Sequence, residues 1–394
     1  MCEDSVAVFR GIRYARYDRF REAVPVEADG DVDATRYGTL CPQRSPRLSK
    51  VLGKVDGLKV EEGSLCLSIF APEEALNAKE KLPVMVWIHG GSYLRGGSED
   101  PRYGAERLVR TGRLVVVKIS YRLGACGYLW NPEEGIENLG LKDQKEGLRW
   151  VRKHIADFGG DPENVTVFSQ SAGAHSAASL IHTMDEPLFS KVILQSPPLG
   201  LHMSVKKAES VYRKFTSLLG RDKYEAGIEE ILDAQAAVSS KDLSMSFMPV
   251  LSKNLEPSRE AVSHGVKVVA GYASRDASIF VMGNGKGLKA LTGRILTGWL
   301  TSRLFSKPTE RYVSMLKSAG IDAQLYRLEW SAEGNPLGSC HCIDLPFLLG
   351  DYDDWKDAQM LRGMTREEFD RNSRIMLDAW CGFANSGIFP EKLI

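Results

Sequence analysis

The chain has 394 residues, of which 43% are hydrophobic and 26% are charged, as in an ordinary globular protein. Its 51 Lys and Arg residues balance its 51 Asp and Glu residues, so no net field favours nucleic acid or an anionic membrane as a partner. Strand-sized apolar runs argue against a membrane span, and the first residues lack the pattern of a signal peptide. Seven cysteines without regular spacing predict free thiols and a cytoplasmic protein.

The predicted strands change character along the chain. Within the first 70 residues, VAVFRGIRYA and LCLSIF favour short antiparallel strands at one edge of a sheet. Later β-rich runs alternate with helical stretches, and several runs are apolar on both faces, as in buried parallel strands. The sequence therefore predicts an α/β fold with a mostly parallel sheet. The later candidate strands are Val84–Ile88, Leu114–Ser120, Val165–Phe168, Val192–Gln195, Val266–Ala270 and Ala323–Leu328.

Helical patterns lie between these strands. The apolar spacing in residues 141–158 predicts an amphipathic helix, and the glycines that follow suit a left-handed cap. Residues 200–260 and 284–320 are also mainly helical, and we expect them to form a cap over the sheet. No repeat or linker divides the chain, so residues 1–394 are predicted to form one domain, with the cap segments at roughly 200–320.

The stretch VTVFSQSAGAHSAASL, residues 165–180, contains a candidate catalytic serine. A β-branched strand, a cluster of small residues and an Ala-rich helix place Ser171 at a sharp corner. This layout is typical of the nucleophile elbow G-x-S-x-G, although Ser169 replaces the first glycine and only Gly173 remains. The amide groups at the start of the helix would face a developing oxyanion. A helix-capping serine is the structural alternative.

A second segment, PVMVWIHGGSYLRGG at residues 83–97, runs from a buried strand into His89, Gly90 and Gly91. Paired glycines let backbone N–H groups approach a ligand without side-chain obstruction. Such a loop upstream of an elbow supplies oxyanion donors in α/β-hydrolases, whereas the simpler alternative is a turn.

The candidate base comes from the chain order serine, acid, histidine, which requires a late histidine. Of the seven histidines, only His264 and His341 lie late enough. His264 precedes a strand at a predicted helix end, where we expect a structural or solvated residue. His341 lies in a Gly-rich loop after the last candidate strand, which suits a base. His175 is on the same helix as Ser171 and is expected to pack.

These segments together resemble the type-B carboxylesterases, a family that includes lipases and the cholinesterases. The similarity extends over most of the chain, and its longest and most specific block is residues 138–176. The other matching segments are FRGIRYA (9–15), YGTLCPQ (37–43), LCLSIFAP (65–72), PVMVWIHGGSYLRGG (83–97), VVVKISYRLGACGYL (115–129), VAGYASRDASIF (269–280) and CHCIDLPFLLG (340–350).

The resemblance implies an α/β-hydrolase fold, with helices on both faces of the sheet and a helical cap, and a serine carboxylesterase that acts through an acyl-enzyme without metal or cofactor. It assigns the nucleophile to Ser171, the base to His341 and the acid to Asp276, where the family usually has glutamate. The oxyanion donors it implies are the N–H groups of Gly90, Gly91 and Ala172.

Several residues depart from the family pattern. Gln170 replaces the common glutamate before the nucleophile, which removes a negative charge and weakens any expectation of a cationic substrate. Asp344, near the histidine, also replaces a glutamate and is a competing candidate for the acid. In the family the cysteine that matches Cys41 often pairs with one in S-E-D-C-L, but Ser64 occupies that position here; Cys66 stays open as a partner.

The leading interpretation is a soluble esterase with a small-molecule ester as its substrate and partner; the sequence indicates no oligomeric state. Another acyl hydrolase on the same fold, such as a lipase, thioesterase or amidase, is the first alternative. A non-catalytic cholinesterase-like binding protein is the second, but such proteins typically lose a catalytic group. Cys340, His341 and Cys342 lack the spacing of a zinc site, so we expect no metal.

Overall fold

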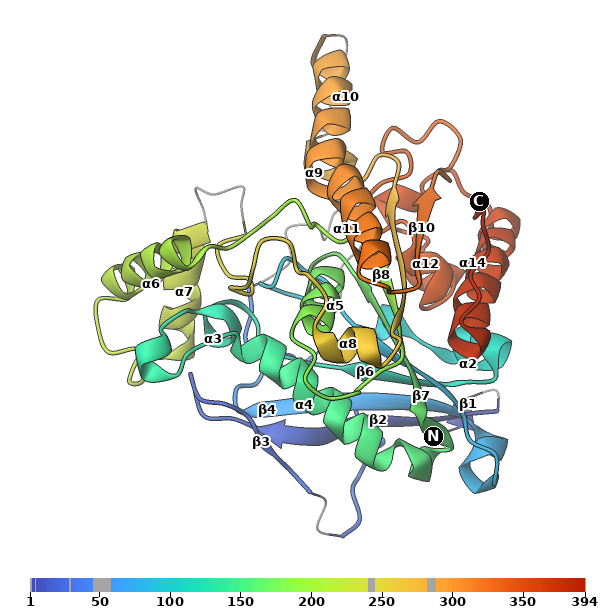
Figure 1. The fold of residues 1–394 in the computed structure, drawn as a ribbon, viewed down its shortest axis with the longest axis horizontal. Helices are drawn as coiled ribbons and strands as arrows, with labels where there is room; N and C mark the ends of the chain where they lie inside the picture. Colours follow the sequence, from blue (N-terminus) through green and yellow to red (C-terminus); the bar gives the residue numbers. More distant parts are fainter. Residues whose placement is uncertain are drawn as a thin grey trace.

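The computed structural model describes residues 2–3, 5–27, 30–44, 58–239, 245–281 and 288–393. A ten-stranded sheet runs through these residues in the order β1-β2-β4-β6-β5-β7-β8-β9-β10, with β3 paired to β2 (Figure 1). The strands are β1 (Cys2–Glu3), β2 (Val6–Arg16), β3 (Val24–Pro25), β4 (Ser64–Pro72), β5 (Leu82–Ile88), β6 (Val115–Ile119), β7 (Gly160–Gln170), β8 (Lys191–Gln195), β9 (Lys267–Ala273) and β10 (Ala323–Leu328).

The sheet combines two directions of pairing. Strands β1 to β4 pair antiparallel, and β4 also pairs antiparallel with β6. From β6 through β5, β7, β8 and β9 to β10 every neighbouring pair is parallel. In the centre of the sheet, Val86 lies opposite Val117 on one side and Val167 on the other. The predicted mostly parallel sheet with antiparallel first strands is confirmed.

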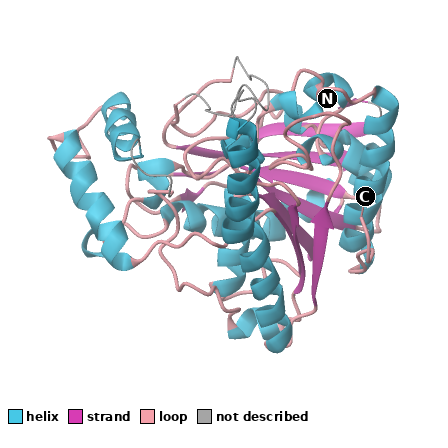
Figure 2. Ribbon diagram, turned by 90° about the horizontal axis from the view of Figure 1, so that it is seen from above, coloured by secondary structure: helices cyan, strands magenta, loops and turns pink. Residues whose placement is uncertain are grey.

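Helices cover both faces of the sheet (Figure 2). The helices before β8 are η1 (Glu73–Asn77), η2 (Pro101–Tyr103), α2 (Glu106–Gly112), α3 (Gly124–Tyr128), η3 (Pro132–Glu134), α4 (Leu139–His154), η4 (Ile155–Phe158) and α5 (Ala172–His182). Those after β8 are α6 (Val205–Leu219), α7 (Ile228–Ser239), α8 (Arg259–Ser263), α9 (Ser278–Val281), α10 (Leu288–Thr301), the π-helical η5 (Ser302–Ser306), α11 (Lys307–Ser318), α12 (Leu345–Leu348), α13 (Tyr352–Trp355), η6 (Gln359–Leu361) and α14 (Arg366–Ser386).

Alternation along β5 divides the core into two layers. Val84, Val86 and Ile88 pack in the layer that also holds the apolar faces of α4 and α5. Met85 and Trp87 point to the opposite layer, with α2 and α14. Since successive side chains of a strand face opposite sides of the sheet, a continuous apolar run is needed wherever both sides are covered. This requirement explains the strands that are apolar on both faces.

The predicted helix over 141–158 forms as α4, which passes into the 3-10 turn η4. The chain then ends the helix at Gly159, whose φ of 83° is left-handed, as the glycine pattern predicted. A fully buried ion pair holds α4 to the loop after β6: the Arg122 guanidinium donates to both carboxylate oxygens of Asp143, at 2.6 and 2.8 Å. Bidentate geometry of this kind fixes orientation as well as distance.

The region from 200 to 320 is mostly helical, as predicted, and also contains β9. In Figure 1 the helices α6 and α7 lie together at one side of the sheet, whereas α10 projects from the top of the molecule. Among the described residues, no helix combines the length and the apolar character needed to cross a membrane.

The six cysteines whose side chains are described are all buried and free: Cys41, Cys66, Cys126, Cys340, Cys342 and Cys381. Cys66, the possible partner of Cys41, is free and lies 3.4 Å from the hydroxyl of Ser64. Burial raises the pKa of both Cys41 and Cys66, which keeps these thiols protonated and unreactive.

Thiol titration of the protein denatured without reductant should therefore find all seven cysteines free. In the native protein the buried thiols should react slowly, because the thiolate is the reactive form. A count of five in the denatured protein would reveal one disulfide and would contradict this prediction.

Candidate active site

The candidate residues follow the carboxyl ends of neighbouring parallel strands. Gly90 and Gly91 follow β5, Ser171 follows β7, Asp276 follows β9 and His341 comes after β10. Carboxyl ends of parallel strands meet at one edge of a sheet, which is where open α/β sheets bind their ligands. The strand order therefore brings together groups that are far apart in the sequence.

Ser171 occupies a strained corner between β7 and α5. Its φ is 57° and its ψ is −124°, a conformation that an L-residue adopts only when its surroundings enforce it. The Ser171 amide donates to the carbonyl of Gln195 at 2.9 Å, which joins the corner to the end of β8. The side chain makes no capping hydrogen bond to α5, so the alternative of a helix-capping serine does not describe this residue.

The elbow needs small neighbours because α5 lies against the end of β5. A Cβ atom on Gly173 would lie 2.2 Å from the carbonyl oxygen of Ile88 and 2.6 Å from that of His89. Ser169, in the position of the missing glycine, is tolerated because it is buried with its hydroxyl donating to the Ile193 carbonyl at 3.2 Å. The departure from G-x-S-x-G thus leaves the corner intact.

A chain of two short hydrogen bonds joins Ser171, His341 and Asp276. The Ser171 hydroxyl lies 2.7 Å from Nε2 of His341, and Nδ1 of His341 lies 2.7 Å from Oδ1 of Asp276. Because a carboxylate only accepts, Nδ1 carries the proton and Nε2 is left to accept from the serine. The structure brings together the three residues that the sequence proposed as a triad.

Asp276 is fully buried with both carboxylate oxygens occupied. Oδ2 accepts from the Ser196 hydroxyl and from the Ala273 amide, each at 2.9 Å. The His341 amide donates to the Asp276 carbonyl at 3.2 Å, so the two loops are also joined through their backbones. This close approach lets an aspartate reach the imidazole, although it is one methylene shorter than the family's usual glutamate.

At two positions of the loop after β5, Gly90 and Gly91, only glycine fits. A Cβ atom on Gly90 would lie 2.7 Å from the Gln170 carbonyl oxygen and 3.1 Å from Cβ of Ser171. Gly91 has a φ of 119°, and a Cβ atom there would lie 1.9 Å from the Arg95 carbonyl oxygen. The Gly90 backbone thus lies directly against Ser171. Ala172, the first residue of α5, has one of the N–H groups that a helix leaves without an internal acceptor.

Asp344, the competing acid, belongs to a different network. Trp380 can only donate through Nε1, and it does so to Oε1 of Gln195 at 3.1 Å, which turns the Gln195 amide nitrogen towards Asp344. That nitrogen donates to Oδ2 of Asp344 at 2.6 Å, while Oδ1 has no partner among the described residues. Burial raises the pKa of Asp344 to about 6. No hydrogen bond joins Asp344 to His341 among the contacts described, so the geometry favours Asp276 as the acid.

Other groups surround His341. The Gln170 side-chain amide lies 3.3 Å from Nε2 of His341, so it is a second donor to the same nitrogen as the serine. The rings of Phe280 and Phe305 lie 5.4 and 5.1 Å from the imidazole ring. Sequence reasoning assigned no contact to these residues or to Ser196. The signal available for Ser196 was its position at the end of a predicted parallel strand.

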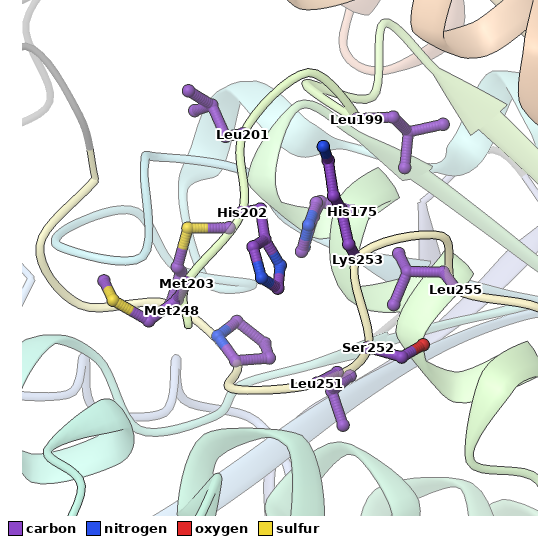
Figure 3. A pocket seen from close by; sticks show the side chains of 11 residues that line it. His175, Leu199, Leu201, His202, Met203, Met248, Leu251, Ser252, Lys253 and Leu255 are labelled. Carbon is purple, nitrogen blue, oxygen red and sulfur yellow. The ribbon is translucent and has the colours of Figure 1, made fainter. Parts of the chain in front are cut away.

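His175, His202 and His264 take no part in the hydrogen bonds that join Ser171, His341 and Asp276. Nδ1 of His175 lies 2.7 Å from the Tyr93 hydroxyl, and burial lowers the pKa of His175 to about 4. His175 also lines a cavity with His202 and a set of apolar side chains (Figure 3). Its volume of about 10 Å³ holds roughly one water molecule and no acyl chain. His264 is exposed at the end of α8. The described residues contain no cluster of metal-ligating groups.

Comparison with known proteins shows the family to which this chain belongs. The carboxylesterase family matches residues 2–291. The chain belongs to the carboxylesterase family. A probable N-octanoylanthranilate hydrolase of Rhodococcus erythropolis is 36% identical over 97% of this chain and 89% of its own length. The para-nitrobenzyl esterase of Bacillus subtilis is 31% identical over 98% of this chain and 87% of its own length.

Solved structures agree with this assignment. A structure titled as a thermophilic PNB esterase superposes with a TM-score of 0.84 at 28% identity, covering 98% of this chain and 89% of the other. The fold is thus the α/β-hydrolase fold, and the chain is a carboxylesterase-family hydrolase, as the resemblance implied.

Substitution of Asp276 and of Asp344 should distinguish the roles of these two carboxylates. Asp276→Asn should lower kcat roughly 10⁴-fold while the protein stays folded, because an amide favours the wrong histidine tautomer. Initial rates on a short p-nitrophenyl ester, with thermal unfolding as the check on folding, measure this effect.

Asp344→Asn is the matched control and should cost far less activity. Since the folded protein keeps the Asp344 proton up to a pH of about 6, against 3.8 for the free side chain, ionisation of Asp344 destabilises the fold as the pH rises through this window. The asparagine variant escapes that loss, so its Tm should rise relative to the native protein between pH 4 and pH 6, roughly. A larger kcat loss for Asp344→Asn than for Asp276→Asn would move the acid to Asp344.

Proposed function

We propose that this carboxylesterase-family hydrolase is a serine carboxylesterase in which Ser171 is the nucleophile, His341 the general base and Asp276 the acid that orients the base. The observation that carries the proposal is the pair of 2.7 Å hydrogen bonds from Ser171 to His341 and from His341 to Asp276. The three side chains are buried, and Ser171 lies at a strained elbow. Acyl transfer requires a nucleophile bonded to a base that is itself bonded to an acid, and the two hydrogen bonds connect the residues in this order.

The reaction follows from these roles. The Ser171 hydroxyl attacks the ester carbonyl while Nε2 of His341 takes its proton. The imidazolium then protonates the leaving alcohol, and water repeats the cycle on the acyl-enzyme. Asp276, held by Ser196 and the Ala273 amide, keeps the proton on Nδ1 and stabilises the positive charge on the ring.

The oxyanion is assigned to the N–H groups of Gly90, Gly91 and Ala172. Support comes from the contact of the Gly90 backbone with Ser171 and from the position of Ala172 at the start of α5. Fixed backbone donors stabilise the tetrahedral oxyanion without reorganising during the reaction, which is usually the largest single contribution to catalysis.

The leaving alcohol departs on the side of His341 because this residue protonates it. Phe280 and Phe305 flank that ring, and Phe280 is half exposed. We propose that the substrate is a small-molecule ester with an aromatic leaving group that packs against Phe280. Two relatives are named after aromatic compounds: the para-nitrobenzyl esterase and the probable N-octanoylanthranilate hydrolase.

We further propose one α/β-hydrolase domain over residues 1–394 with a helical cap drawn from 200–320, in a reducing, cytoplasmic compartment. A single sheet from β1 to β10 supports the domain assignment, and the helices of 200–320 support the cap. The six buried free thiols support the reducing compartment.

Ser171→Ala should lower kcat by roughly 10⁴- to 10⁶-fold without unfolding the protein, because it removes the group that forms the acyl-enzyme. A fluorophosphonate should label Ser171 alone, as mass spectrometry of the peptides would show. Full activity of the variant, or labelling at another serine, would contradict the assignment. A native protein that is inactive on all short p-nitrophenyl esters would support the non-catalytic alternative, and an acyl chain-length series would distinguish an esterase from a lipase.

Phe280→Leu should lower kcat/KM for benzyl acetate by roughly 2- to 10-fold, the range of an aromatic pair contact, and should leave cyclohexylmethyl acetate unaffected. These two esters have similar size and leaving-group chemistry, so their ratio isolates the aromatic contact. Trp299→Leu is the matched control, since Trp299 is an exposed aromatic residue on α10. An equal loss for both esters would show that Phe280 only packs against His341.

A further inference from the structure

The segment between Asp276 and Glu310 contains basic residues but no acidic ones. Residues 277–309 contain five basic residues, Lys286, Lys289, Arg294, Arg303 and Lys307, and no acidic residue. The whole chain, by contrast, has equal numbers of basic and acidic residues. The neutral total therefore conceals a stretch of sequence that is basic.

The helix in this segment, α10, exposes its apolar side chains and buries polar ones. Ile295 and Trp299, one turn apart on the same face, are 67% and 54% exposed, and Leu296 beside them is 45% exposed. Thr297 and Thr301 are only 2% and 5% exposed. A surface helix of a globular protein normally has the reverse arrangement, with its apolar face towards the core. Figure 1 shows α10 projecting from the top of the molecule, beyond the sheet.

Basic side chains flank the apolar face. Arg294 and Arg303 are exposed, and the Arg303 guanidinium lies over the Trp299 ring, 5.2 Å from its centroid. Lys307, at the start of α11, is exposed as well. Apolar and aromatic side chains beside Lys and Arg are the composition of helices that lie in the interface of an anionic membrane.

The same segment borders the catalytic histidine. Phe280 before α10 and Phe305 after it both contact the ring of His341, and the Ala277 amide donates to Thr301 at 3.0 Å. Anything bound to α10 would therefore lie close to His341, on the side of the site where Phe280 is exposed.

We propose that α10 seats this protein on an anionic lipid surface. Ile295, Leu296 and Trp299 enter the boundary between headgroups and acyl chains, and Arg294 and Arg303 pair with lipid phosphates. A second copy of the chain fits the face less well, because a two-fold contact through α10 would bring two basic segments together. The proposal goes beyond the esterase chemistry and does not depend on the triad.

Flotation of the full-length protein with phospholipid vesicles tests the proposal. The protein should bind phosphatidylcholine vesicles that contain phosphatidylglycerol more tightly than pure phosphatidylcholine vesicles, and high salt should weaken the difference. The variant Ile295→Ser/Leu296→Ser/Trp299→Ser should lower binding roughly 10-fold or more. Arg294→Gln/Arg303→Gln should keep weak binding but lose the preference for phosphatidylglycerol.

Ile388→Ser is the matched control, since Ile388 is 70% exposed in the turn after α14 and lies outside this segment. It should leave binding unchanged, and none of these variants should alter hydrolysis of a soluble p-nitrophenyl ester. Absence of a preference for phosphatidylglycerol, or equal binding by the triple serine variant, would overturn the proposal. A native dimer that the triple variant dissociates in analytical ultracentrifugation would identify a second copy as the occupant and would overturn it too.

Discussion

The backbone of Ser171 is the constraint on which the rest of the site depends. A positive φ at a non-glycine residue is costly, and it persists here because β7, α5 and the loop after β5 meet at one point. Gly173 and Gly90 permit that meeting, since a Cβ atom on either would lie within 3 Å of a neighbouring backbone oxygen. The same crowding places the Ser171 hydroxyl next to His341 and the Gly90 backbone next to Ser171. The strained backbone, the close packing and the proposed catalytic geometry therefore have one structural cause.

The end of β8 organises the groups around this corner. The Gln195 carbonyl accepts the Ser171 amide, while its side chain holds Asp344 and the indole of Trp380 on α14. The next residue, Ser196, holds the carboxylate of Asp276. Two consecutive residues therefore hold Ser171 on one side and Asp276 on the other. A central parallel strand suits this task because both of its neighbours, β7 and β9, end at the same edge.

Much of this arrangement could be predicted from the sequence. The strands, the elbow at Ser171 and the late histidine follow from local patterns and from the chain order of the triad, and Asp276 follows from the family resemblance. The contacts of Ser196, Gln170 and Phe305 were not predicted, because each joins segments that are distant in sequence. Ser196 is 80 residues from Asp276 and Gln170 is 171 residues from His341, and the end of a predicted strand marks the position of Ser196 but not its partner. The balanced total charge does not describe every part of the chain, since residues 277–309 contain five basic residues and no acidic one.

The shorter acid shows how a departure from the family pattern is compensated. An aspartate places its carboxylate nearer to its own backbone than a glutamate does, so the loops that hold acid and base must approach each other. Two backbone hydrogen bonds fix this approach: the Arg275 amide donates to the Ser339 carbonyl at 2.9 Å, and the His341 amide donates to the Asp276 carbonyl at 3.2 Å. With the loops paired in this way, the hydrogen bond from His341 to Asp276 needs no long side chain, and Ser196 and the Ala273 amide hold the carboxylate in place. The substitution of Asp for Glu is thus accommodated by the fold of the two loops and does not by itself indicate an inactive site.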